Sequence, residues 1–212
     1  MPKAGYTWHN YAGDLAALLD HLDVESAHVV GCSMGGGIAL MFALLYPERV
    51  RSLVLADNAL PGFTYSPEFS AHIQSMIEAL QTEGAAAAFE RLWLTHPFFD
   101  GIKRFPERLA ELRETVLGYA APEYQADYPG EGDYEQPDVV ARLHEIAAPT
   151  LVVVGEHDVE DFRLIAEVMA GAIPRGRLQV VADAWHVPNM EKVEEFNGML
   201  VEWLGEVEGM RA

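Results

Sequence analysis

Short apolar runs alternate with longer segments of helical periodicity along most of this chain. Some of the runs predict β-strands, because they are short, rich in aliphatic residues, and bounded by Gly, Pro or polar residues. These runs are residues 28–30, 50–56, 151–154 and 178–181. Strands that alternate with helices form parallel sheets, so the pattern predicts the α/β fold class.

Apolar residues spaced three and four apart predict amphipathic helices beside these strands. The first helix ends near Asp23, and its apolar positions are Tyr11, Leu15, Leu18, Leu19 and Leu22. Residues 38–45 are apolar throughout and predict a buried helix that stops before Pro47. Later helices are predicted between the last two strands and after them, with apolar faces formed by Phe162, Ile165, Ala166, Met169 and Ile173, and by Phe196, Leu200, Leu204 and Val207.

Residues 61–145 contain no convincing strand and therefore predict a helical insertion. Helix starts are expected at Pro67 and Pro106, because proline suits the first turn of a helix. Another start is expected after Gly84, where a run of alanines follows. Residues 128–136 are rich in Gly, Pro and acidic residues and predict a loop.

The composition limits the classes of protein to consider. Half of the 212 residues are apolar, which suits one core with a small appended subdomain. A net charge of −19 without a basic stripe argues against a nucleic-acid partner, because such binding depends on clustered Lys and Arg. No apolar run reaches the length of a membrane span, residues 1–10 lack the apolar core of a signal peptide, and Cys32 has no second cysteine to pair with. We expect a cytoplasmic protein that does not bind membranes.

Gly31-Cys32-Ser33-Met34-Gly35 matches the pattern G-x-S-x-G and lies between an apolar strand and a helix, which predicts a nucleophile elbow. A serine on such a strained turn needs small flanking residues, which Gly31 and Gly35 provide. The helix that starts here directs its amide groups at the serine, and the amide of Met34 is the expected oxyanion donor. The alternative is a glycine-rich loop without chemistry. A dinucleotide-binding loop would need glycine in place of Ser33.

A serine hydroxyl is a poor nucleophile unless a histidine held by a carboxylate takes its proton. Asp158 follows the third predicted strand and His186 follows the fourth, at the sheet edge where parallel sheets gather their active sites. The predicted catalytic residues are therefore Ser33, Asp158 and His186. Asp57, which ends the second strand, remains an alternative acid, and Asp161 is a weaker one; His186 as an ordinary loop histidine is the competing interpretation.

Other polar and aromatic residues carry less specific signals. The histidines at positions 9, 21, 72, 96 and 144 occur singly, without metal-ligand spacing, so we interpret most of them as solvated or helix-face residues and expect no metal or cofactor. Cys32 is expected to be a small buried thiol. Aromatic residues of the insertion either line an acyl pocket or pack the insertion itself; they are Phe63, Tyr65, Trp93, Phe98 and Phe99.

Three motifs, residues 31–37, 155–158 and 186–191, together resemble the α/β-hydrolase superfamily, in particular its esterase, enol-lactonase and cofactor-free haloperoxidase-like members. The resemblance covers nearly the whole chain. It implies an α/β-hydrolase fold with a truncated parallel sheet of about four strands flanked by helices. The core would comprise residues 1–60 and 146–212, and residues 61–145 would form the helical cap of this family.

The resemblance also implies a function, namely cleavage of a small ester or lactone through an acyl-enzyme on Ser33. Family members normally begin with further strands and a His-Gly loop that donates a second oxyanion amide, and no residue before Ser33 matches that loop. The alternatives are therefore a weak or inactive fragment with a binding or assembly role, and a perhydrolase. Trp185 stands where the family usually has glycine. The strand before Ser33 would be a bare sheet edge, which predicts a homo-oligomer.

Overall fold

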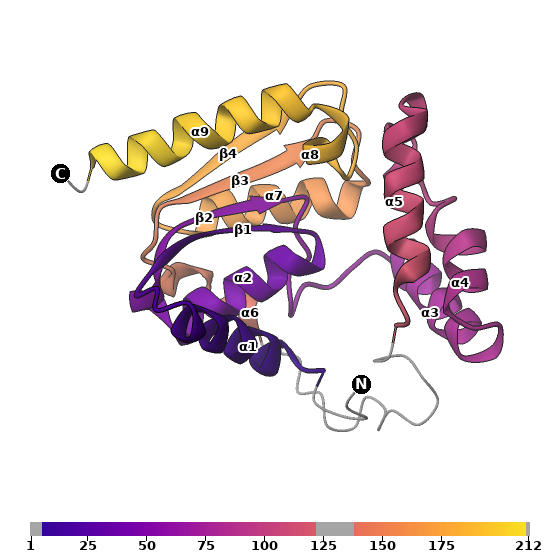
Figure 1. Ribbon diagram of the computed structural model, residues 1–212, viewed down its shortest axis with the longest axis horizontal. Helices are drawn as coiled ribbons and strands as arrows, with labels where there is room; N and C mark the ends of the chain where they lie inside the picture. Colours follow the sequence, from indigo (N-terminus) through magenta and orange to yellow (C-terminus); the bar gives the residue numbers. More distant parts are fainter. Residues whose placement is uncertain (1–5, 122–137, 211–212) are drawn as a thin grey trace.

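The computed structural model describes residues 6–121 and 138–210, whose centre is a four-stranded parallel sheet (Figure 1). The strand order is β1-β2-β3-β4. The strands are β1 Ala27–Cys32, β2 Val50–Ala56, β3 Thr150–Gly155 and β4 Gly176–Val181. All the predicted strands are confirmed, and the α/β-hydrolase fold class with them.

The two central strands are the most apolar because both of their faces are covered. Every residue of β3 is buried, as are nearly all of β2. The edge strands differ, since Val30 on β1 is 48% exposed and Val180 on β4 is 47% exposed. The sheet therefore has two open edges among the described residues, and β1, which leads to Ser33, forms one of them.

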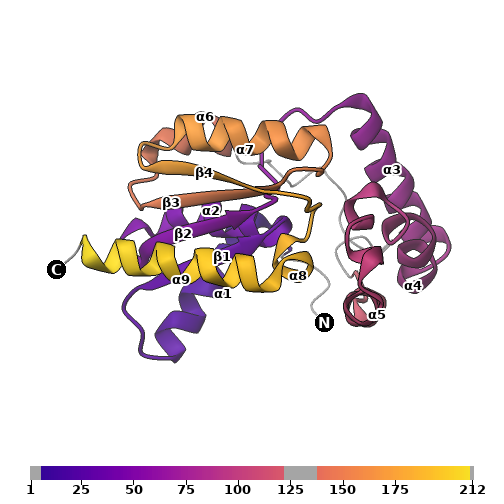
Figure 2. The ribbon, with the colours of Figure 1, turned by 90° about the horizontal axis from the view of Figure 1, so that it is seen from above.

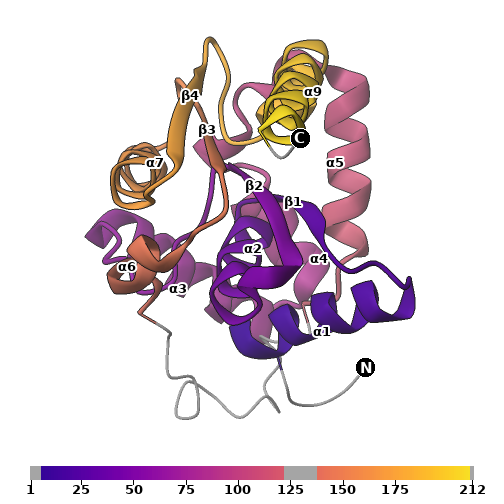
Figure 3. The same ribbon diagram turned by 90° about the vertical axis from the view of Figure 1, so that its left-hand side faces the viewer.

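Helices cover both faces of the sheet (Figure 3). On one face lie α2 and α7, and α1 packs against α2; on the other face lies α9. Their bounds are α1 Trp8–His21, α2 Met34–Leu45, α7 Glu160–Ala172 and α9 Val193–Gly209. A 3₁₀ turn, Pro47–Arg49, precedes β2, and the short helix α8, Pro188–Glu191, precedes α9.

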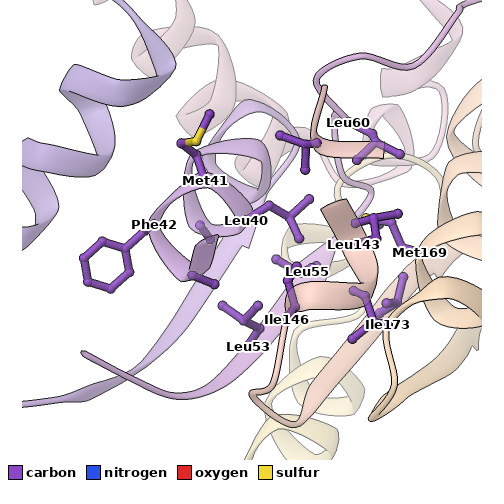
Figure 4. Packing of buried hydrophobic residues seen from close by; sticks show 14 of the residues in the cluster. Leu40, Met41, Phe42, Leu53, Leu55, Leu60, Leu143, Ile146, Met169 and Ile173 are labelled. Carbon is purple, nitrogen blue, oxygen red and sulfur yellow. The ribbon is translucent and has the colours of Figure 1, made fainter. Parts of the chain in front are cut away.

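Alternate residues of β2 point into two separate apolar clusters, as strand geometry requires. Leu53 and Leu55 face α2 and α7 in the larger cluster, part of which is drawn in Figure 4. Val54 and Ala56 face α9 in the smaller one, with Phe196. The core of the molecule thus lies on both sides of the sheet.

The apolar face predicted for α1 is partly wrong. Leu18 and Leu22 are 50% and 58% exposed, whereas Ala12, Ala16 and Leu19 are buried. The pattern of large residues was misleading because α1 packs closely on α2, where small alanine side chains fit better than leucine.

The insertion is helical in its described part, and its helices stand beside the carboxyl ends of the strands (Figures 1 and 2). They are α3 Pro67–Thr82, α4 Ala85–Ala88 and α5 Pro106–Gly118, joined by a π-helical turn, Phe89–Trp93, and by 3₁₀ turns, Pro97–Phe99 and Ile102–Arg104. The predicted helix starts at positions 67, 85 and 106 are confirmed. The predicted loop at 128–136 lies outside the described residues.

The end of the insertion packs against α2 and α7, on the face of the sheet that these helices cover. Helix α6, Val139–Arg142, and the 3₁₀ turn Leu143–Glu145 place Val139 and Leu143 in the larger apolar cluster. The division into a core and a cap at residues 61–145 stays a prediction. None of the helices in the described ranges is both long and apolar enough to span a bilayer.

Candidate active site

Ser33 sits on the turn between β1 and α2 in a strained backbone conformation, with φ 52° and ψ −120°. Non-glycine residues rarely adopt this region, so the surrounding groups must hold the turn in place. The Ser33 amide donates to the Ala56 carbonyl at 2.9 Å. The Ser33 carbonyl accepts from the amides of Gly36, Gly37 and Ala59 at 3.0–3.2 Å. These bonds tie the turn to the end of β2 and to the first turn of α2.

Glycines around Ser33 allow close backbone contacts, but not all at the expected positions. A Cβ at Gly31 would lie 2.5 Å from the Gly35 carbonyl oxygen, so the predicted requirement for a small residue is met there. A Cβ at Gly35 would have nothing within 4 Å in the described part of the chain, so the packing argument does not apply to it. The tight position is instead Gly36, where a Cβ would fall 1.5 Å from Asn58 Oδ1.

The structure brings Ser33, Asp158 and His186 together. His186 Nδ1 and Asp158 Oδ2 are 2.8 Å apart, and His186 Nε2 and Ser33 Oγ are 3.0 Å apart. A carboxylate only accepts hydrogen bonds, so Nδ1 donates to Asp158 and Nε2 is left to accept from the serine hydroxyl. The Val159 amide donates to Asp158 Oδ1 at 2.8 Å. Asp158 and His186 are 3% and 2% exposed.

Glu191 holds the loop that carries His186, a role that the sequence analysis missed. Its carboxylate accepts from the Trp185 amide at 3.0 Å and from the Val187 amide at 3.3 Å, on either side of the histidine. Burial raises the pKa of Glu191, and the two amide donors oppose that rise. The sequence signal for this role was the acidic residue Glu191, which lies at the end of the short helix that follows His186.

The turn that carries Asp158 and the loop that carries His186 pack directly against each other. A Cβ at Gly155 would lie 2.0 Å from the Trp185 carbonyl oxygen, so only glycine fits without a shift of the backbone. The Trp185 ring lies 4.5 Å from that of His157, and the Arg104 guanidinium lies 4.8 Å above it. Trp185 thus contacts both the Asp158 turn and the insertion.

Two aromatic residues pack on the catalytic histidine candidate itself, Phe98 from the insertion and Phe162 from α7. The Phe98 ring stacks on His186 with centroids 3.8 Å apart, and Phe162 contacts the same imidazole edge-on at 4.6 Å. The His186 amide also donates to the Phe98 carbonyl at 3.3 Å. Phe98 and Phe99 are buried. Of the two alternatives for the insertion aromatics, packing is therefore favoured for this pair.

Two histidines that the sequence pattern treated as occurring singly lie together. The rings of His72 and His96 have centroids 4.2 Å apart, and His96 also contacts Phe98 at 4.2 Å. Burial, with a smaller effect of the neighbouring His72, lowers the pKa of His96 to about 4. Helix α3 and the segment after the π-helical turn bring them together, which periodicity along one helix cannot reveal.

The alternative acids are placed differently from Asp158. Asp161 accepts from the backbone amide and the hydroxyl of Ser66 and so holds the residue that caps α3. Asp57 is fully buried, and its Oδ1 accepts from the Gly155 amide at 2.9 Å. The hydrogen bond to His186 is made by Asp158, so the geometry favours Asp158 as its carboxylate partner.

Asp57, Asp158 and His186 are the one cluster of potential metal ligands found among the described residues, with their ligand atoms within 4.8 Å of one another. Asp158 and His186 already contact each other at hydrogen-bond distance, which is closer than two ligands usually lie on one ion. Cys32 is partly buried beside them, and burial raises the pKa of its thiol far above the usual range. It is therefore a neutral thiol, as expected.

A family model for the alpha/beta hydrolase fold matches residues 1–193. The chain belongs to the α/β-hydrolase family. It is 30% identical over 208 residues to a Bacillus subtilis protein provisionally named 2-succinyl-6-hydroxy-2,4-cyclohexadiene-1-carboxylate synthase, with 94% of this chain and 73% of that protein covered.

Solved structures of this α/β-hydrolase's relatives agree with the fold. A thermophilic esterase from Thermogutta terrifontis has a TM-score of 0.78 and 31% identity, with 98% of this chain and 75% of that chain covered. The enol-lactonase from Burkholderia xenovorans LB400 has a TM-score of 0.78 and 26% identity, with 96% and 75% covered. The chain thus spans about three quarters of these relatives, and the comparison supports a hydrolase of this fold.

Proposed function

We propose that this α/β-hydrolase is a serine hydrolase that cleaves a small ester or lactone through an acyl-enzyme on Ser33. One observation carries the proposal: a single buried imidazole contacts both the Ser33 hydroxyl and the Asp158 carboxylate. The names of an esterase and an enol-lactonase among the relatives support this class of substrate.

In the proposed mechanism, Ser33 Oγ attacks the carbonyl carbon of the substrate while His186 Nε2 takes the hydroxyl proton. Asp158 keeps the imidazole in the tautomer that leaves Nε2 free to accept. His186 then gives the proton to the leaving oxygen, and the acyl group stays on Ser33. A water molecule, activated by the same histidine, releases the acid.

The oxyanion in this mechanism is held by the amide of Met34. This residue begins α2, and the first amides of a helix have no acceptor within the helix. The partial positive charge at the start of α2 adds to the effect. The amide of Met34 directly follows Ser33 in the chain, and in the proposed mechanism negative charge develops on the substrate oxygen beside Ser33.

The proposal is tested by labelling the purified protein with a fluorophosphonate probe, which reports an activated serine without knowledge of the substrate. We expect labelling in the wild type and its loss in Ser33→Ala and in His186→Ala. Matched controls are Ser75→Ala and His144→Ala, which remove exposed side chains far along the sequence from Ser33. Circular dichroism spectra show whether each variant folds.

A folded wild type that takes no label would overturn the proposal and would favour the inactive-fragment alternative. If labelling occurs, hydrolysis of short esters and lactones defines the substrate class. The same assay with added hydrogen peroxide, monitored for peracid, separates an esterase from a perhydrolase, because peroxide then replaces water in the second step.

A further inference from the structure

Asp57 is a buried acidic residue that the proposed mechanism does not use. It directly follows β2 with a positive φ of 43°, and its amide donates to the Val153 carbonyl at 2.9 Å. Its Oδ1 accepts from the Gly155 amide, so it links the end of β2 to the end of β3. Its Oδ2 is buried and has no hydrogen-bond donor among the described residues. An ionised oxygen in that position would be desolvated without compensation.

The carboxyl group of Asp158 lies close to that of Asp57, because each contributes an oxygen within 4.8 Å of the other and the two side chains are within hydrogen-bonding reach. Asp158 receives one donor on each oxygen, from the Val159 amide and from His186 Nδ1. Two carboxylate oxygens offer about four acceptor positions, so Asp158 can accept a further hydrogen bond. Asp57, whose Oδ2 lacks a partner among the described residues, and Asp158, which can accept a further hydrogen bond, are therefore close enough to share one.

The charges around Asp57 also oppose its ionisation. The titratable groups that face it are Cys32 at the end of β1, Asp158 after β3, and His186 and Glu191 after β4. None of the described Lys or Arg side chains forms an ion pair with it. Burial and the negative charge of Asp158 raise the pKa of Asp57 well above its usual value.

We propose that Asp57 carries a proton and donates a hydrogen bond from its Oδ2 to the carboxylate of Asp158, which makes Asp57 a positioning residue for the Asp158–His186 pair. Asp158 would then be held by three donors, two from the protein scaffold and one from the imidazole. The two carboxyl groups together carry one negative charge, which matches the single positive charge of His186 during turnover. The positioning role rests on the proposed function, whereas the protonation does not.

Protonation is tested without any substrate by infrared spectroscopy at neutral pH, because a carboxylic acid and a carboxylate absorb at separate frequencies. We expect a carboxylic-acid band in the wild type that is lost in Asp57→Asn. The matched control is Asp161→Asn, which removes a carboxylate that already accepts from Ser66 and therefore keeps the band. A wild type and Asp57→Asn with the same spectrum in this region would overturn the proposal.

The pH dependence of stability provides a second test that is independent of activity. The folded protein keeps a proton on Asp57 that the unfolded chain releases above its ordinary pKa of 3.8. The stability present below that pH is therefore lost progressively as the pH rises toward the raised folded pKa. Asp57→Asn lacks this titration, so its melting temperature should fall less than that of the wild type between about pH 4 and pH 8. An equal fall would count against the proposal.

The positioning role is tested by the rate of probe labelling as a function of pH. Asparagine keeps an acceptor for the Gly155 amide and a donor for Asp158. Asp57→Asn should therefore keep the labelling rate of the wild type and the pH at which this rate falls on the acid side of its profile. Asp57→Ala loses the donor, and its rate should fall roughly tenfold to a hundredfold, the range for a lost hydrogen bond to a charged group. If Asp57 were ionised instead, asparagine would remove a charge and move the acid limb to lower pH by roughly one to three units.

The two proposals fail in different ways. A wild type that takes no label but shows the carboxylic-acid band would refute the serine hydrolase and keep the protonated Asp57. Labelling with no such band would keep the hydrolase and refute the protonated acid. Labelling with the band, but with equal rates in Asp57→Ala and the wild type, would refute the positioning role.

Discussion

The strained backbone at Ser33 has a glycine two residues before it and another two residues after it, and neither carries a side chain. Gly31 and Gly35 stand symmetrically about the serine in the sequence, but their surroundings differ. At Gly31 a methyl group meets backbone atoms that cannot move aside, whereas at Gly35 the described chain leaves open space. The same motif therefore contains one glycine required by packing and one that is free of that constraint.

This difference predicts opposite outcomes for two alanine substitutions. Gly31→Ala should lose about 1–3 kcal/mol of unfolding free energy from overpacking and should lower probe labelling. Gly35→Ala should stay within about 1 kcal/mol of the wild type, on the stabilising side, because alanine suits a helix better than glycine. Urea denaturation measures both. Equal destabilisation by the two substitutions would contradict the packing argument.

A second residue-scale prediction concerns acid stability. The unfolded chain protonates a histidine near its ordinary pKa of 6.5, whereas folded His96 resists protonation until about 4. Between these values the unfolded state binds more protons, so the protein loses stability as the pH falls through this window. His96→Asn should lose less stability than the wild type as the pH falls through this window, and the exposed control His144→Asn should lose as much as the wild type. Melting temperatures measured at several pH values test this prediction. The same dependence of melting temperature on pH in His96→Asn and in the wild type would refute it.

At the scale of elements, the loop after β4 depends on one carboxylate. Glu191 accepts from the amides on both sides of His186, and it is almost fully buried. Arg108 on α5 donates to the carbonyls of Met190 and Glu191, which fixes the same turn from the insertion. The position of the imidazole is thus set by backbone contacts as well as by Asp158.

Glu191→Ala should therefore destabilise the fold and slow labelling together. The buried amide of Val187 and the partly buried amide of Trp185 lose their acceptor, which costs about 1–3 kcal/mol for a buried group left unsatisfied. Glu202→Ala, on the exposed side of α9, is the matched control and should change neither property. The test combines urea denaturation with the labelling rate of Ser33. Unchanged labelling in a folded Glu191→Ala variant would show that the loop keeps its geometry without this side chain.

Local patterns were sufficient to predict the strands and the order of the site residues. Ser33 follows β1, Asp158 follows β3 and His186 follows β4, so the sequence order placed all three at the sheet edge formed by the carboxyl ends of the parallel strands. The contact between Phe98 and His186 was not predictable, because periodicity does not place the insertion relative to the sheet. The roles of Asp57 and Glu191 depend on the same kind of contact between distant segments.

At the scale of the whole molecule, the sheet ends in two different edges. Strand β1 has no partner on its outer side among the described residues, and Val30 on it is half exposed. An unpaired edge offers amides and carbonyls to another strand. We propose that two copies of this chain associate through β1.

Light scattering coupled to size exclusion should show a dimer in the wild type at high concentration and a monomer for Val30→Lys. A lysine there places a desolvated charge in the proposed interface. Val180→Lys carries the same change to a residue of equal exposure on β4, the opposite edge, and should remain dimeric. A wild type that stays monomeric at all concentrations would refute the association.

The close approach of Gly155 to the Trp185 carbonyl has a practical consequence for protein engineering. The acid turn and the histidine loop are far apart in the sequence, but the backbone of the histidine loop leaves no room for a β-carbon at Gly155. A histidine loop taken from a relative has a backbone shaped to fit the acid turn of that relative. It would not necessarily fit against the acid turn of this chain. Loop exchange in this scaffold should therefore move both segments as one cassette.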